Sequence, residues 1–94
     1  MKTNDIVHDA DAGRFETRVD GLHCEAAYHM IDDVMWLTHT GVPSALRGRG
    51  IAALLVAAAL DHARAHGLKV HPACSYVRAY MRRHPQTLDL LDKA

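Results

Sequence analysis

Two arginines and two glycines alternate within residues 42–52, between a predicted strand and the longest predicted helix. Arg47 and Arg49 carry guanidinium groups, which grip phosphate oxygens through charge-assisted hydrogen bonds. Gly48 and Gly50 let the backbone approach a ligand closely. The amide hydrogens at a helix N-terminus, aligned with the helix dipole, also favour anions. The stretch therefore predicts a phosphate-binding loop.

This loop differs from two common phosphate-binding motifs. It is not followed by the Gly-Lys-Ser/Thr of a Walker loop. It also lacks the third glycine and the acidic residue of the dinucleotide-binding fingerprint. An ordinary strand-to-helix turn with two solvated arginines is the alternative interpretation, and the loop residues alone leave both open.

The elements that position the loop begin with an antiparallel meander. A short edge strand is expected in the first ten or so residues, before a turn containing Gly13. Residues 14–19 alternate polar and apolar with a period of two, which predicts a half-buried strand. Asp20-Gly21 predicts a type I′ hairpin turn. A turn at Asp32-Asp33 leads to a central strand over residues 34–42. The return strand between the two turns has five residues on one face: Leu22, Cys24, Ala26, Tyr28 and Met30.

The hydrophobic period changes after Pro43. Apolar residues at helical spacing predict a helix from about Ala45 to His66, ended by Gly67. A short strand over residues 68–71 and a second helix over residues 75–83 follow. This order predicts a right-handed crossover into a parallel pair near the middle of the sheet. The fold class is α+β: an antiparallel meander followed by a helix, a parallel-paired strand and a second helix.

Composition limits the function classes. A length of 94 residues predicts one domain over residues 1–94. Eleven Lys and Arg balance eleven Asp and Glu, which argues against a nucleic-acid partner. The longest apolar run, residues 51–60, is too short to span a bilayer. Without a secretion leader, and with two cysteines at no metal-type spacing, we expect a cytoplasmic protein. His62 and His66 lack a third ligand, so no metal site is expected.

The string Arg47-x-x-Gly50-x-Ala52 matches the Arg/Gln-x-x-Gly-x-Gly/Ala signature of the GNAT superfamily of N-acetyltransferases, whose loop holds the pyrophosphate of coenzyme A. Together with Cys74-Ser75-Tyr76-Val77 and Arg83-His84-Pro85, residues 14–91 resemble its short, single-domain, YidJ-like branch. The resemblance implies a minimal GNAT-like mixed sheet. That branch lacks the helices that longer relatives place between the first two strands to shape the acceptor pocket.

The resemblance implies an acetyl-CoA-dependent N-acetyltransferase that moves an acetyl group to an amine, such as a protein or peptide lysine, by direct attack in a ternary complex. In the superfamily the pantetheine arm enters where the fourth and fifth strands splay apart. A module that binds coenzyme A or acyl-CoA with little or no transfer is the alternative, and a monomer or weak homodimer is expected. The implied cofactor-binding residues are Thr40, Gly41, Val42, Arg47, Gly48, Arg49, Gly50, Ile51 and Ala52.

Three residues near the splay form the predicted catalytic group. Tyr80 matches by position the tyrosine that commonly protonates the leaving sulfur in the superfamily, and Tyr76 is the second match. His39, predicted on the strand face opposite Trp36, would take a proton from the incoming ammonium. Cys74 precedes the second helix, whose N-terminus lowers a thiol pKa. It either lines the pocket during direct transfer or, paired with His39, carries the acetyl group in two steps.

Overall fold

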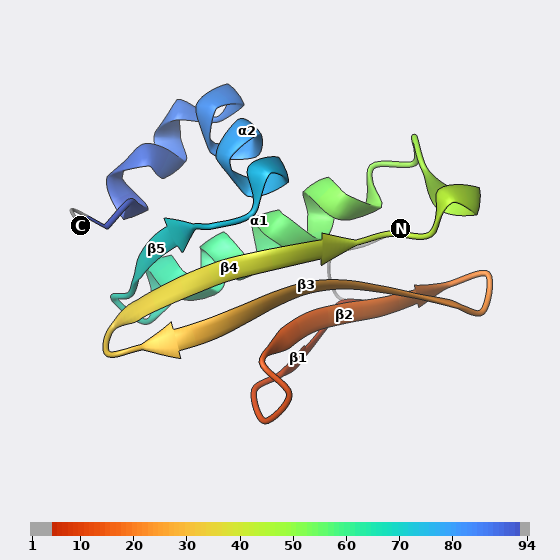
Figure 1. Cartoon of the computed structure of the whole chain (residues 1–94), viewed down its shortest axis with the longest axis horizontal. Helices are drawn as coiled ribbons and strands as arrows, with labels where there is room; N and C mark the ends of the chain where they lie inside the picture. Colours follow the sequence, from red (N-terminus) through yellow and green to blue (C-terminus); the bar gives the residue numbers. More distant parts are fainter. Residues whose placement is uncertain (1–4, 93–94) are drawn as a thin grey trace.

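A computed structural model of the chain describes residues 5–92, which form a mixed sheet with the strand order β1-β2-β3-β4-β5 (Figure 1). The strands are β1 (Val7–Asp9), β2 (Arg14–Val19), β3 (Leu22–Ile31), β4 (Val34–Gly41) and β5 (Lys69–Pro72). The helices are α1 (Ile51–Ala65) and α2 (Ser75–Arg83), with the 3₁₀ turns η2 (Ser44–Leu46) and η3 (Pro85–Leu90). Within residues 5–92 no helix is long and apolar enough to cross a bilayer.

The predicted meander is confirmed over the described residues, while residues 1–4 of the predicted edge segment lie outside them. Strands β1 to β4 pair antiparallel with their sequence neighbours. Asp20 and Gly21 both have positive φ, at 53° and 75°, as a type I′ turn requires. At the other hairpin Asp32 also has φ of 53°. Short turns with these residues therefore fix the register of the first four strands.

The parallel pair lies at the edge of the sheet, so its predicted place near the middle was wrong. Strand β5 pairs with β4 from Val34↔Lys69 to Leu37↔Pro72. On the other side of β5, the described residues provide only an isolated bridge from Val70 to Leu91. The chain turns into α2 after β5 and adds no further full strand there.

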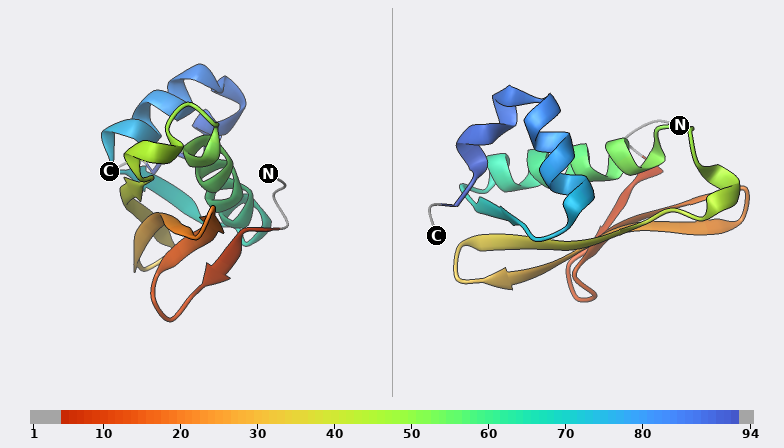
Figure 2. Two further views of the ribbon diagram at one scale, coloured as in Figure 1. Left: turned by 90° about the vertical axis from the view of Figure 1, so that its right-hand side faces the viewer. Right: turned by 45° about the horizontal axis from the view of Figure 1, so that its top comes forward.

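One face of the sheet carries the core. Helix α1 packs against this face, and α2 lies beside it near the β5 edge, whereas the opposite face of β2–β4 is left without a covering helix in the described part of the chain (Figure 2). Met35 and Leu37 from β4 are fully buried against Leu55 and Val56 of α1 in one hydrophobic cluster. Cys24 belongs to the same cluster with 0% exposure, as expected for a small apolar side chain.

Helix α1 starts later than predicted, at the first apolar residue of its helical pattern. The prediction placed its first residue near Ala45, but the helix begins at Ile51. Gly48 and Gly50 have φ of 82° and 78°, in the left-handed region that a right-handed helix cannot include. Only the single turn of η2 forms before them. A separate loop therefore stands between β4 and the helix.

Candidate active site

Strand β4 extends beyond its partner β5. Pairing between them ends at Leu37↔Pro72, where the Cys74 amide donates a hydrogen bond of 2.9 Å to the Leu37 carbonyl. Residues 38–41 continue as a strand and pair with β3 alone among the described residues. Their backbone edge on the α2 side is the splay that the resemblance implied.

A β-bulge lies at the start of this splay. Tyr28 pairs with Leu37 and Ala27 with His39, so Thr38 is an extra residue on β4. The extra residue shifts the alternation of side chains by one position. His39 consequently shares the open sheet face with Trp36 and lies opposite Thr40. The prediction that His39 and Trp36 lie on opposite faces was wrong because it assumed a regular strand.

The first amides of α1 lie outside the hydrogen-bond ladder of the helix. Its first turn closes with the Leu54 amide donating to the Gly50 carbonyl, so the amides of residues 51–53 precede the helical ladder. Gly50 occupies the N-cap and has no side chain to cap them, and the first turn holds no acidic residue. The positive end of the helix dipole therefore faces the loop without a counter-charge from that turn.

A cavity of about 430 Å³ joins the helix start to the free part of β4. This volume lies within the range of small-molecule sites. Every residue predicted to bind the cofactor lines it except Gly41 and Arg49, and Tyr76 of α2 completes the wall. The lining residues are Thr40, Val42, Leu46, Arg47, Gly48, Gly50, Ile51, Ala52 and Tyr76.

The two predicted cofactor residues outside this lining have other contacts. A Cβ atom added to Gly41 would lie 2.9 Å from Nε2 of His39 and 3.7 Å from Cγ of Glu25. Gly41 therefore makes room for the imidazole on the open sheet face. The Arg49 guanidinium donates from Nη1 to Oδ2 of Asp20 at 2.8 Å and so is held by the β2–β3 hairpin.

Cys74 is half-buried beside the free part of β4. Its Sγ atom lies 3.6 Å from Oγ1 of Thr40. Burial is the largest single influence and raises the pKa of the thiol. The amide of Val77, the hydroxyl of Thr40, the amide of Tyr76 and the amide of Thr40 together outweigh it, so the pKa lies below its usual value. The two amides at the helix start lower the pKa, which is the direction that the sequence predicts. His39 lies on the other sheet face, so the structure does not bring it to Cys74.

The two tyrosines of α2 have different surroundings. Tyr76 lines the loop cavity, whereas Tyr80 borders a separate hollow of about 130 Å³ with Asp61 and Arg64 of α1. Burial, with the nearby Asp61 and Tyr76, raises the pKa of Tyr80. Its ring stacks on His84 at a centroid distance of 4.0 Å. The structure thus brings the second of the two tyrosine candidates to the loop.

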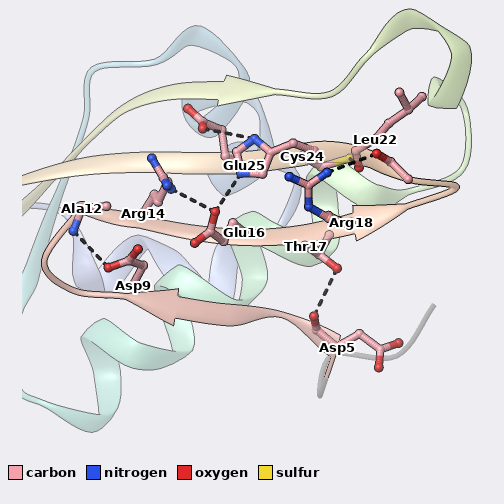
Figure 3. A network of polar contacts seen from close by, with 12 residues as sticks. Asp5, Asp9, Ala12, Arg14, Glu16, Thr17, Arg18, Leu22, Cys24 and Glu25 are labelled. Atoms are coloured by element: carbon pink, nitrogen blue, oxygen red, sulfur yellow. Dashed lines mark hydrogen bonds and ion pairs between the residues drawn. The ribbon is translucent and has the colours of Figure 1, made fainter.

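A larger hollow of about 620 Å³ lies over β1 and β2, and three of its charged side chains, Arg14, Glu16 and His23, contact one another. Glu16 accepts a hydrogen bond of 3.0 Å from Nε of Arg14 and lies 2.8 Å from Nε2 of His23 (Figure 3). The contact with His23, followed by that with Arg14, lowers the pKa of Glu16. Arg18 is bonded to the Gly21 carbonyl. The loop cavity is therefore the stronger candidate site.

The two histidines of α1 lie against each other on the helix. His62 and His66 stack with a centroid distance of 4.1 Å. Across residues 5–92, no group of three or more His, Cys, Asp or Glu side chains is arranged to hold a metal ion.

A family model for the GCN5-related N-acetyltransferases matches residues 14–90, which include the loop, the free part of β4 and α2. The chain belongs to this family. The domain is therefore a GNAT-type N-acetyltransferase domain, and the predicted superfamily and fold class are confirmed.

Curated relatives and a solved structure extend this result. The chain is 39% identical to protein NATD1 from Mus musculus over 83 residues, 85% of this chain and 76% of that protein. It is 36% identical to protein NATD1 from Danio rerio over 89 residues, which are 89% of this chain and 81% of that protein. The NMR structure of a GCN5-like protein from Staphylococcus aureus, proposed to be an N-acetyltransferase, aligns with a TM-score of 0.75 and 26% identity. That alignment covers 100% of this chain and 93% of the other.

Proposed function

We propose that this domain transfers the acetyl group of acetyl-CoA to an amine, such as a protein or peptide lysine, by direct attack in a ternary complex. The observation that supports it best is the cavity connecting the uncapped start of α1 to the free edge of β4. The amides of residues 51–53 and the Arg47 guanidinium suit a diphosphate. The free edge of residues 38–41 suits the amide groups of a pantetheine arm, which would pair like an added strand.

The incoming ammonium must first lose one proton so that its nitrogen has a free electron pair. The neutral amine nitrogen then bonds to the thioester carbonyl carbon while the carbon–sulfur bond breaks. As the amide forms, the nitrogen loses a second proton and the leaving sulfur gains one. We propose that His39, on the open sheet face beside Gly41, takes the first proton. Tyr76 is our first candidate for giving a proton to the leaving sulfur because it lines the cavity. Tyr80 stays a prediction from the resemblance. Cys74 would line the splay as a pocket residue.

A module that binds acyl-CoA without efficient transfer is the second candidate. In its favour, the open face of β2–β4 has no covering helix among the described residues, so nothing there encloses an acceptor (Figure 2). We further propose a cytoplasmic protein acting as a single domain, as a monomer or weak homodimer. Two free thiols, Cys24 and Cys74, accord with a reducing compartment.

Incubation with acetyl-CoA and a pool of lysine-containing peptides separates these functions. The transferase predicts release of free CoA thiol together with acetylated peptide detected by mass spectrometry. We expect Tyr76→Phe to slow the release of CoA thiol more than Tyr80→Phe does. His39→Gln should also release the thiol more slowly than the unmodified chain. Tight CoA binding without thiol release would support the module. A chain that binds no CoA would refute both functions.

A further inference from the structure

The β2–β3 hairpin reaches the same end of the molecule as the loop before α1 (Figures 1 and 2). At this point Oδ2 of Asp20 accepts the 2.8 Å hydrogen bond from Nη1 of Arg49. Both side chains are exposed, Asp20 at 65% and Arg49 at 50%. The contact joins a turn residue of the meander to the centre of the phosphate-binding signature, 29 residues later in the chain.

The two arginines of the loop are placed differently. Arg47 lines the cavity, whereas Arg49 lies outside its lining and reaches toward the hairpin. Gly48 and Gly50 border Arg49 on either side, and a Cβ atom at either glycine would meet no atom within 4 Å. The surroundings of Arg49 are therefore open, and its guanidinium is tethered by one exposed carboxylate.

We propose that Asp20 competes with the diphosphate of bound CoA for Arg49. In the free protein the Asp20 carboxylate neutralises Arg49 and holds it aside. When the diphosphate occupies the cavity, its oxygens replace this carboxylate as partners of Arg49. The inference rests on the proposed function, since it assumes that CoA binds at the loop. Asp20 is a positioning residue, because it acts on the ligand through Arg49.

The size of the effect follows from the exposure of the ion pair. Ion pairs between exposed side chains are weak, so an anion with more than one negative charge can displace the carboxylate. Removing the Asp20 charge should therefore tighten CoA binding by about two- to fivefold. Because solvent ions screen exposed charges, this gain should shrink as the salt concentration rises.

Asp20→Asn is the informative substitution. Asparagine accepts the left-handed conformation of this turn as well as aspartate does, so the hairpin is retained. Asp32→Asn is the matched control, because Asp32 has the same φ of 53° at the hairpin on the opposite end of β3. We expect calorimetric titration with CoA at low salt to give a smaller Kd for Asp20→Asn and an unchanged Kd for Asp32→Asn.

The same substitution made in an Arg49→Ala variant separates competition for Arg49 from a general effect of the Asp20 charge. In Arg49→Ala, the further change Asp20→Asn should leave the Kd for CoA unchanged, because no guanidinium remains to be released. A gain that persists there, or an Asp20→Asn variant that binds CoA no better than the unmodified chain, would overturn the proposal. In either case the unmodified chain still binds CoA and the proposed function stands. If no form binds CoA, the proposed function fails and this inference fails with it.

Discussion

The two halves of β4 differ in their strand partners and in their burial. Residues 34–37 pair with β3 on one side and β5 on the other, and Met35 and Leu37 are fully buried. Residues 38–41 pair with β3 alone and stay partly or fully exposed. The bulge at Thr38 marks the border. An unpaired strand edge is a liability in most sheets, and the proposed function gives this one a partner, because the pantetheine arm would pair with it.

Removing core volume from the paired half should have the largest effect. We expect Leu37→Ala to lower the free energy of unfolding by about 2–5 kcal/mol, because it leaves a cavity under α1. The matched change Thr38→Ala, one residue further on in the exposed half, should cost less than about 0.5 kcal/mol. Urea denaturation of both variants measures the difference. Equal losses of unfolding free energy in the two variants would show that the two halves of β4 contribute equally to stability, against what their burial indicates.

Substitutions in the loop before α1 test whether CoA binds beside residues 38–41 of β4. Arg47→Ala removes the guanidinium of a residue that lines the cavity, so we expect CoA binding to weaken about tenfold with little change in stability. Lys69→Ala is the control, because it removes the same charge at the start of β5, at the far end of the sheet. Titration calorimetry gives both dissociation constants. A similar loss in the two variants would indicate general attraction of an anion rather than a site at the loop.

Local signals made much of this architecture predictable from sequence. The limits of β2 and α2 follow from the pattern of their side chains, and Asp20-Gly21 fixes a hairpin through its own backbone preference. The bulge at Thr38 depends on the register with β3, so a regular alternation put His39 on the wrong face. The Asp20–Arg49 contact joins two distant turns, and only the folded chain brings them together.

The start of α1 shows a similar limit. The prediction starts the helix near Ala45, although the apolar residues at helical spacing begin at Ile51. The positive φ of Gly48 and Gly50 keeps the residues before Ile51 out of the helix. The signature glycines were seen as a means of close approach to a ligand, but their positive φ also sets where the helix begins. The resemblance puts Tyr80 ahead of Tyr76 by position in the chain, whereas the packing of α2 decides which tyrosine lines the cavity, and that residue is Tyr76.

The reactivity of the two cysteines compares the core, where Cys24 lies, with the splay, where Cys74 lies. Cys74 is partly exposed with a lowered pKa, while Cys24 is fully buried and burial raises its pKa. Iodoacetamide should therefore alkylate Cys74 in the native protein and Cys24 only after unfolding. With CoA at ten times its Kd, alkylation of Cys74 should slow roughly tenfold. Mass spectrometry of the two peptides measures this, and unchanged labelling of Cys74 would place CoA elsewhere.

The smallest expected effect is a change in the pH dependence of stability, which comes from a histidine cluster away from the splay. His8 of β1 and His62 of α1 lie 4.4 Å apart between ring centroids, beside Phe15 and His66. Burial is the main cause that lowers the pKa of both His8 and His62. Between these lowered values and about 6.5, the unfolded chain binds more protons, so stability should fall as the pH drops through this window.

Variants test this pH dependence by urea denaturation at a series of pH values. His62→Phe should flatten the loss of stability below pH 6.5, since it removes one of the two groups that must stay neutral. His29→Gln, an exposed position on β3, should leave the slope unchanged. A His62→Phe slope equal to that of the unmodified chain would assign the acid sensitivity to other groups.

The division of β4 is tested most directly by following its backbone amides in a ¹H–¹⁵N NMR titration with CoA. The account predicts the largest shifts at residues 38–41 and 48–53, with small shifts at residues 34–37 because β5 already occupies their edge. Shifts spread equally along β4, or confined to another part of the sheet, would contradict it.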